Sequence, residues 1–184
     1  MMRFVFLISL FILSGFLSYA QDSSSRMLED AVRSLKDSGT IIYVDSSYNF
    51  SGLIKNISQR RVLTGKNENT KVTFSLTKAE VRFLDKEFHK YPPFVWPSGM
   101  FNNSLLVTYD SASSIRLKMM KEQNRMSYKA FFLFSRIVYF RNNSFAAFRL
   151  AELYGISAGY DYLFFYQRIN GEWRKYMKIY VGAW

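Results

Sequence analysis

The 184-residue sequence contains no cysteine and a single histidine, His89. Without cysteine there can be no disulfide, no thiol nucleophile, no lipid-anchored N-terminal cysteine and no thiolate zinc site. The lone histidine has no second histidine with which to hold a metal. A glycine-rich phosphate loop and a Gly-x-Ser-x-Gly motif are also missing. The residues therefore indicate no cofactor and no catalytic constellation.

Long hydrophobic runs are absent beyond the first twenty residues. These read MMRFVFLISLFILSGFLSYA, with Arg3, an apolar run over residues 4–17 and a small-x-small ending at Ala20. That order is typical of a signal peptide. The run is shorter than the roughly 20 residues that span a bilayer. We expect cleavage after Ala20, export to the periplasm or the extracellular space, and one domain over residues 21–184 without a stable membrane anchor; an uncleaved anchor is the alternative.

Acidic residues are scarce, with 14 against 25 lysines and arginines, and the formal net charge is +11. Residues 111–150 hold one acid, Glu122, and eight bases: Arg116, Lys118, Lys121, Arg125, Lys129, Arg136, Arg141 and Arg149. This imbalance favours anionic partners such as acidic glycans or lipid headgroups, although a solvated basic surface would look the same. Nucleic acid is not expected, because the chain carries an export signal and no nucleic-acid-binding motif.

Aromatic residues are abundant, with 18 Phe, 13 Tyr and 3 Trp, and their burial can replace disulfides in stabilising an exported domain. Apolar spacing predicts helices at about 25–37, 78–90 and 111–123. The second of these begins with a capping box, Thr77 and Glu80. Strands are expected at 40–45, near 60–64, at 71–76 and at 104–109.

The last quarter of the chain holds four aromatic-rich runs, at 131–140, 145–154, 160–168 and 172–182. The turn signals between them predict an α+β fold, in which two or three helices pack on a curved antiparallel β-meander. Asn170-Gly171 favours a type I′ turn, which places Arg168 opposite Trp173 for a cation–π contact. The same register puts Tyr160, Tyr162, Phe164 and Tyr166 on one face with Met177, Ile179 and Val181, and leaves Lys178 and Tyr180 on the other.

Two charged positions on this sheet are candidate sites. A turn at residues 141–144 places Arg136 opposite Arg149, and like charges so opposed are unfavourable. An acidic side chain from a helix, solvent exposure at the rim of the sheet or a bound anion must therefore compensate. If residues 155–159 form a five-residue loop, Glu152 lies opposite Tyr162, on a face with Tyr154 and Tyr160. This tyrosine-lined carboxylate is a candidate pocket, or else a hydrogen-bonded structural acid.

Several stretches resemble a group of small secreted proteins of Bacteroidetes. They are LTKAEVRFLDKEF, WPSGMFNNS, FSRIVYFRNNSFAAFRLAELYG and LFFYQRINGEWRKY, and the resemblance covers about residues 77–184. The Asn170-Gly171-Glu172-Trp173 hairpin is its most recognisable part. The resemblance implies export and a related fold, and it implies no activity.

These observations favour an exported, non-catalytic binding or interaction module. One alternative is a small ligand-sequestering protein or enzyme that uses the tyrosine-lined face around Glu152. Another is an inhibitor of a second exported enzyme, acting through the basic surface.

Overall fold

The computed structural model describes residues 24–35, 40–46, 61–90, 94–112, 114–115, 130–154 and 158–183. Within these ranges nine strands form one sheet, in the order β3-β2-β9-β8-β7-β5-β1-β4, with β6 also paired to β7. The strands are β1 (Ile41–Val44), β2 (Val62–Asn67), β3 (Thr70–Ser75), β4 (Ser104–Val107), β5 (Phe131–Phe134), β6 (Val138–Phe140), β7 (Phe145–Tyr154), β8 (Ala158–Ile169) and β9 (Glu172–Ala183).

The fold is α+β, as the sequence predicted, but the sheet is mixed. β1 runs parallel to both of its neighbours, β4 and β5, whereas all other pairs are antiparallel. The expected antiparallel meander therefore accounts for only part of this sheet. The runs predicted at 145–154, 160–168 and 172–182 do form neighbouring antiparallel strands, β7, β8 and β9.

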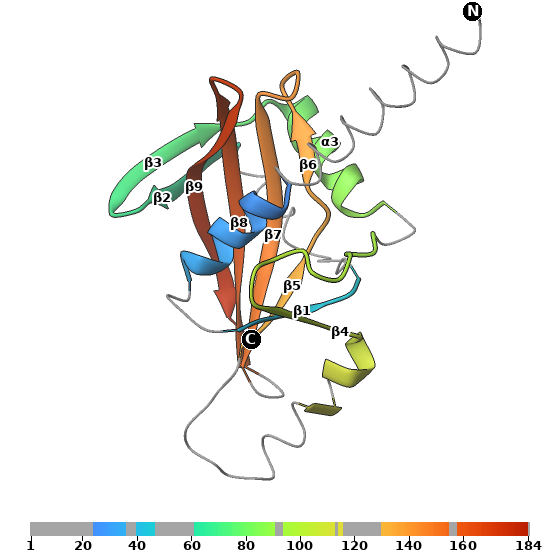
Figure 1. Ribbon diagram of the computed structural model, residues 1–184. Helices are drawn as coiled ribbons and strands as arrows, with labels where there is room; N and C mark the ends of the chain where they lie inside the picture. Colours follow the sequence, from blue (N-terminus) through green and yellow to red (C-terminus); the bar gives the residue numbers. More distant parts are fainter. Residues whose placement is uncertain are drawn as a thin grey trace, which may run out of the picture.

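Both faces of the sheet are covered at its centre. On the first face, which carries Phe148, Leu150, Phe164 and Tyr166, the helix of residues 24–33 and the segment 94–101 close the core. On the second face α3 (Lys78–Phe88) packs over Leu163, Phe165 and Met177. In Figure 1 the helix of residues 24–33 crosses in front of β7 and β8, whereas α3 lies behind the sheet. This two-sided burial explains why the described side chains of β7 are all buried.

The helix of residues 24–33 has the apolar spacing that predicted it: Met27, Leu28, Ala31 and Val32 are buried. Its polar side is also fixed to the sheet. Tyr166 Oη donates a hydrogen bond to Asp30 Oδ2 at 2.5 Å, and Lys175 Nζ lies 3.9 Å from the same oxygen. Burial and the neighbouring Asp30 carboxylate raise the pKa of Tyr166, so its hydroxyl stays a donor. None of the described helices is long and apolar enough to cross a membrane.

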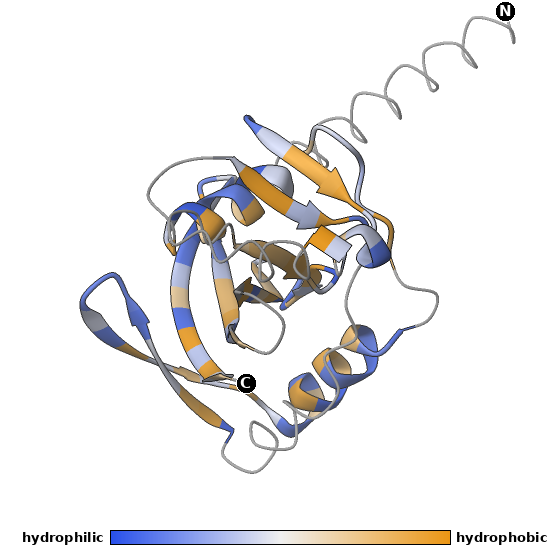
Figure 2. Ribbon diagram, turned by 90° about the horizontal axis from the view of Figure 1, so that it is seen from below, coloured by the Kyte–Doolittle hydropathy of each residue, from blue (hydrophilic) through white to orange (hydrophobic). Residues whose placement is uncertain are grey.

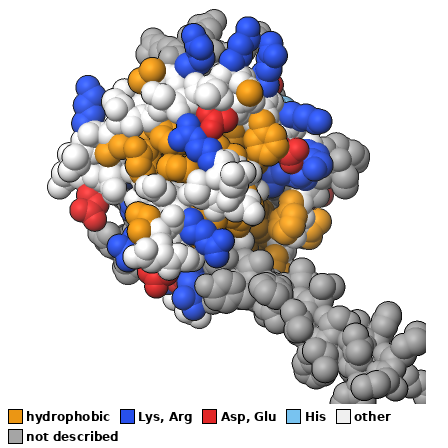
Figure 3. Space-filling view, turned by 90° about the horizontal axis from the view of Figure 1, so that it is seen from above, with side chains coloured by type: hydrophobic (Ala, Val, Ile, Leu, Met, Phe, Trp, Pro, Cys, Tyr) orange, Lys and Arg blue, Asp and Glu red, His pale blue; other side chains and the backbone are white. Residues whose placement is uncertain are grey.

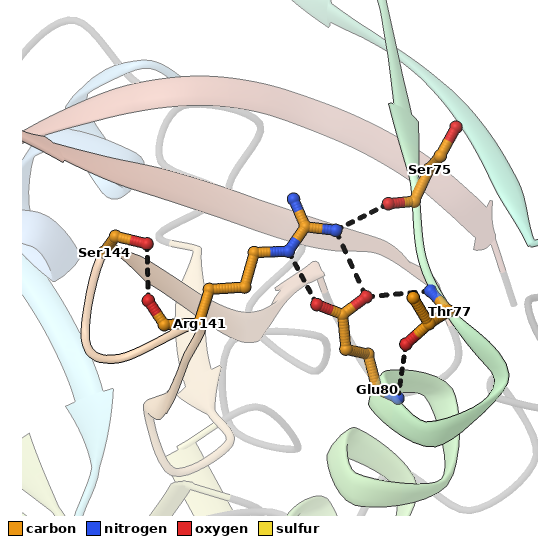
Figure 4. A network of polar contacts seen from close by, with 5 residues as sticks. All are labelled: Ser75, Thr77, Glu80, Arg141 and Ser144. Carbon is orange, nitrogen blue, oxygen red and sulfur yellow. Dashed lines mark hydrogen bonds and ion pairs between the residues drawn. The ribbon is translucent and has the colours of Figure 1, made fainter.

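At the start of α3 the predicted capping box is present, and Glu80 also binds Arg141 (Figure 4). Arg141 Nε donates to Glu80 Oε1 at 2.6 Å, and its terminal nitrogen donates to Glu80 Oε2 at 3.1 Å and to the Ser75 carbonyl at 2.7 Å. The guanidinium carbon lies 4.5 Å from the ring centre of Phe74. One arginine in the β6–β7 turn thus ties together α3, β3 and the second-face core.

The β8–β9 hairpin begins as the sequence predicted. Asn170 and Gly171 both have positive φ, at 52° and 86°, as a type I′ turn requires. Arg168 pairs with Trp173, and its guanidinium carbon lies 5.9 Å from the ring centre, so the expected cation–π contact is confirmed. Figure 2 shows hydrophilic and hydrophobic residues alternating along β9, which curves toward the C-terminus.

Beyond the turn, the expected register was wrong. The pairing shifts between Phe165 and Tyr166, because β9 contains an extra residue, Tyr176, and it shifts again between Asp161 and Tyr162. Phe164 therefore pairs with Lys178 instead of Met177, and Tyr162 pairs with Tyr180 instead of Ile179. Because side chains alternate between the two faces of a sheet, one inserted residue moves each following side chain of the strand to the opposite face. Lys178 and Tyr180 consequently lie on the first face, and Met177 lies on the second.

Replacing Glu80 by Gln should lower the melting temperature most at neutral pH. Arg141 lowers the pKa of Glu80 from its ordinary 4.5 to about 2. The ionised carboxylate therefore stabilises the fold fully above the ordinary value, and this contribution is lost as the pH falls toward 2. Thermal unfolding between pH 7 and 2.5 should show the two proteins converging in acid. Glu87→Gln, at a 3.4 Å surface pair with Lys90, is the control and should change little; a pH-independent gap for Glu80→Gln would contradict the account.

Candidate functional site

The expected opposition of Arg136 and Arg149 was wrong. The run predicted as one strand is broken at residues 135–137, between β5 and β6. β6 keeps the predicted pairing, with Phe140 opposite Phe145, but β5 is shifted by one residue. Ser135 fills the place opposite Arg149: its amide donates to the Arg149 carbonyl at 3.0 Å, and its hydroxyl accepts from the Arg149 amide at 2.9 Å. Arg136 lies in the break and is half-buried.

Arg149 instead forms a buried ion pair with Asp161 on the second face. Each residue is 4% exposed, and the pair is enclosed by the apolar side chains of β7 and β8. Burial raises the pKa of Asp161, and the guanidinium only partly offsets this. Since Arg149 already has a carboxylate partner and does not face Arg136, the reason for expecting an anion between the two arginines is gone.

The second candidate site predicted from the sequence, the tyrosine-lined pocket around Glu152, lies on the first face. Only some of its residues are neighbours in the structure. Glu152 is 3% exposed and pairs with Tyr160, not with Tyr162, because Tyr154 pairs with Ala158 and the connection is shorter than expected. Tyr162 lies two residues along β8 on the same face. Burial first, and then the Glu152 carboxylate, raises the pKa of Tyr162 to about 12. Tyr154 ends β7, and its side chain lies outside the described residues.

A third tyrosine joins this group because of the bulge in β9. The ring centres of Tyr160, Tyr162 and Tyr180 lie 6.5, 6.2 and 5.9 Å apart, pair by pair, and the rings are inclined by 49–60° to one another. Tyr160 is 44% exposed and Tyr180 57% exposed, whereas Tyr162 lies deeper. The three rings therefore form an open aromatic cluster at the edge of the first-face core.

Lys178 borders the aromatic cluster. Its Nζ lies 5.5 Å from the ring centre of Tyr162, within cation–π distance. Burial lowers the pKa of Lys178, and the positive charges of Lys175 and Lys66 lower it further, while Glu152 opposes this. An anion brought to this place would offset the repulsion between Lys178 and its neighbours Lys175 and Lys66.

Two more lysines continue from Lys178 across the sheet. Lys66 of β2 pairs with Lys178 of β9 on one side and with Lys71 of β3 on the other. Directly paired residues share a face, so three lysines stand side by side on three adjacent strands. Gly65 allows the backbones of β2 and β9 to lie this close together, because a Cβ at this position would lie 2.7 Å from the Lys178 carbonyl oxygen. Lys66 and Lys71 are exposed, since the helix of residues 24–33 does not extend over the β2–β3 hairpin.

We call this group the lysine–tyrosine strip, and it consists of Lys71, Lys66, Lys178, Tyr162, Tyr180 and Tyr160. Sequence reasoning found its two β8 tyrosines and Glu152 beside them, but placed Lys178 and Tyr180 on the opposite face. It missed Lys66 and Lys71 altogether, because the two-residue turn at Glu68-Asn69 lacks the Asn-Gly signal of a hairpin. Glu68 has a φ of 52° in this turn, and a glutamate does not predict such a left-handed conformation.

The chain matches no known protein family, no curated protein and no solved structure. Within the described ranges, no three His, Asp or Glu side chains are grouped so that they could hold a metal ion. What can be said of function therefore rests on the geometry of the strip.

Replacing Asp161 by Asn should destabilise the protein by about 3–5 kcal/mol, because it leaves the Arg149 guanidinium buried without a carboxylate. The double variant Arg149→Met/Asp161→Leu removes both charges and should recover most of that loss. Urea unfolding at pH 7 measures both.

Asp85→Asn is the matched control, since Asp85 is half exposed and lies beside His89; its effect should stay within about 0.5 kcal/mol. A loss for Asp161→Asn as small as that of the control would show that the pair is not buried as described.

Proposed function

We propose that this protein is an exported, non-catalytic binding module that holds a polyanionic ligand on the lysine–tyrosine strip. The row of Lys71, Lys66 and Lys178 carries the proposal. Like charges directly opposed on neighbouring strands are destabilising, and here the repulsion occurs twice in succession. A row of anionic groups lying across the three strands would convert that repulsion into attraction.

The pattern of ion pairs supports this reading over a merely solvated surface. Lys175, on the same face, has Asp30 as its neighbour, and Arg141 has Glu80. Among the residues that the structure describes, neither Lys66 nor Lys71 forms an ion pair with an acidic side chain. The strip therefore combines the cationic charge and the exposure that a polyanion needs.

The charge of the whole molecule favours the same class of ligand. The net charge is +11, and the end of the molecule seen in Figure 3 carries many lysine and arginine side chains among fewer acidic ones. Such a field attracts anions from a distance and raises their rate of encounter. The basic residues and the N-terminal export pattern together point to an anionic partner outside the cytoplasm.

Binding is favoured over hydrolysis by the placement of the carboxylates. Glu152 lies beside the aromatic cluster on the first face, whereas Asp161, one residue away from Tyr160 and Tyr162, points to the second face and pairs with Arg149. A pair of carboxylates that flank a substrate bond must share one site. Glu152 and Asp161 do not share a site, because they lie on opposite faces of the sheet.

The double variant Lys66→Ala/Lys71→Ala should elute from a heparin column at a clearly lower salt concentration than the native protein. Two exposed ion pairs at about 0.5–1 kcal/mol each correspond to roughly a tenfold loss of affinity. Since the interaction is between exposed charges, native retention should also fall steeply as salt is raised.

The matched control is Lys78→Ala/Lys86→Ala, which removes the same charge from exposed positions of α3 on the other side of the sheet. This control variant should elute at nearly the same salt concentration as the native protein. Equal shifts for the two double variants would show that retention reflects total charge, and native retention no stronger than that of a neutral protein would refute polyanion binding.

A further inference from the structure

Resting on the proposed function, we infer that the polyanion is an acidic oligosaccharide. Its carboxylate or sulfate groups lie along Lys71, Lys66 and Lys178, and one of its sugar rings lies against Tyr160, Tyr162 and Tyr180. The strip itself motivates this assignment, because its charged half and its aromatic half adjoin at Lys178.

The aromatic half of the strip calls for a ligand with a ring. Tyr160 and Tyr180 expose about half of their surface although they are large aromatic residues. Each ring offers an apolar face and a hydroxyl at its rim, and tyrosine is enriched at binding sites for this reason. A sugar ring has the complementary form, since its C–H groups make an apolar face and its hydroxyls lie around the edge. A bare anion such as phosphate would use the lysines alone.

The length of the strip calls for more than one sugar unit. It crosses β3, β2, β9 and β8, which are consecutive neighbours in the sheet. Three intervals between adjacent strands measure about 14 Å in total. A single monosaccharide would reach either the outer lysines or the tyrosines. A ligand that contacts both halves therefore has several linked units, with its acidic groups repeated along it.

The inclination of the rings distinguishes a sugar from a nucleobase. Single-stranded nucleic acids bind to aromatic side chains on which successive bases stack. Here the three rings are inclined by 49–60° to one another, so they offer no parallel platforms for successive bases, whereas one sugar ring can lie against them.

A quaternary ammonium ligand fits the aromatic cluster less well. Three aromatic rings around a cation are a known mode of recognition for such ligands. In this protein Lys178 Nζ already lies over the face of Tyr162 and would repel a second cation. The same lysine attracts an acidic group on a sugar ring that lies against the aromatic cluster, so it favours anionic over cationic ligands.

The test uses the double variant Tyr160→Ala/Tyr180→Ala, and isothermal titration with four probes: an oligogalacturonate, a chondroitin sulfate oligosaccharide, linear polyphosphate and an oligo-dT strand. At least one sugar probe should bind the native protein, and the tyrosine variant should bind it about tenfold more weakly, a loss typical of an aromatic contact at a binding site. Polyphosphate affinity should be unchanged in that variant. Lys66→Ala/Lys71→Ala should weaken the sugar and polyphosphate alike.

The control variant is Tyr109→Ala, which removes a tyrosine that is 50% exposed and lies outside the strip; it should leave all affinities unchanged. If no probe binds, the proposed function fails and the inference fails with it. If polyphosphate binds but neither sugar does, or if the tyrosine variant binds sugar like the native protein, the inference is wrong and polyanion binding stands. Tighter binding of an oligo-dT strand that depends on the tyrosines would replace the sugar by nucleic acid.

Discussion

The rest of the molecule depends on burying both faces of β7 and β8. Phe148 and Phe164 are covered by the helix of residues 24–33, and Leu163 and Phe165 by α3, so the centre of the sheet exposes almost no side chain. A sheet covered on both sides can present a binding surface only where the cover ends. In this protein the first-face cover ends before the β2–β3 hairpin, and the lysine–tyrosine strip occupies that exposed part of the sheet.

The charged residues at the buried centre of the sheet show how strictly burial on both faces limits where a charge can lie. Arg149 and Asp161 enter the second-face core only as a pair, because either charge alone would be too costly there. Glu152 enters the first-face core at the margin of the aromatic cluster, where Lys178 and exposed tyrosines adjoin it. Arg149 and Asp161 thus stabilise the interior, whereas Glu152 lies on the other face beside the aromatic cluster.

Local chemistry made much of the fold predictable. The capping box of Thr77 and Glu80 begins α3, and Asn170-Gly171 closes the last hairpin, because each acts within a few residues. The site was less predictable because it depends on two non-local events. No residue type marks Tyr176 as the bulge that moves Lys178 to the first face, and nothing near Lys66 shows that β2 will pair with β9, more than a hundred residues later. The parallel pairing of β1 was hidden for the same reason.

The strip depends on the bulge at Tyr176, since without it Lys178 and Tyr180 would lie on the second face. Nuclear Overhauser effects between β8 and β9 in the free protein test it directly. With the bulge in place, we expect contacts from the Tyr162 ring to the Tyr180 ring and to the side-chain methylenes of Lys178. Contacts from the Tyr162 ring to Ile179, with none to Tyr180, would establish the uninterrupted register and contradict the bulge.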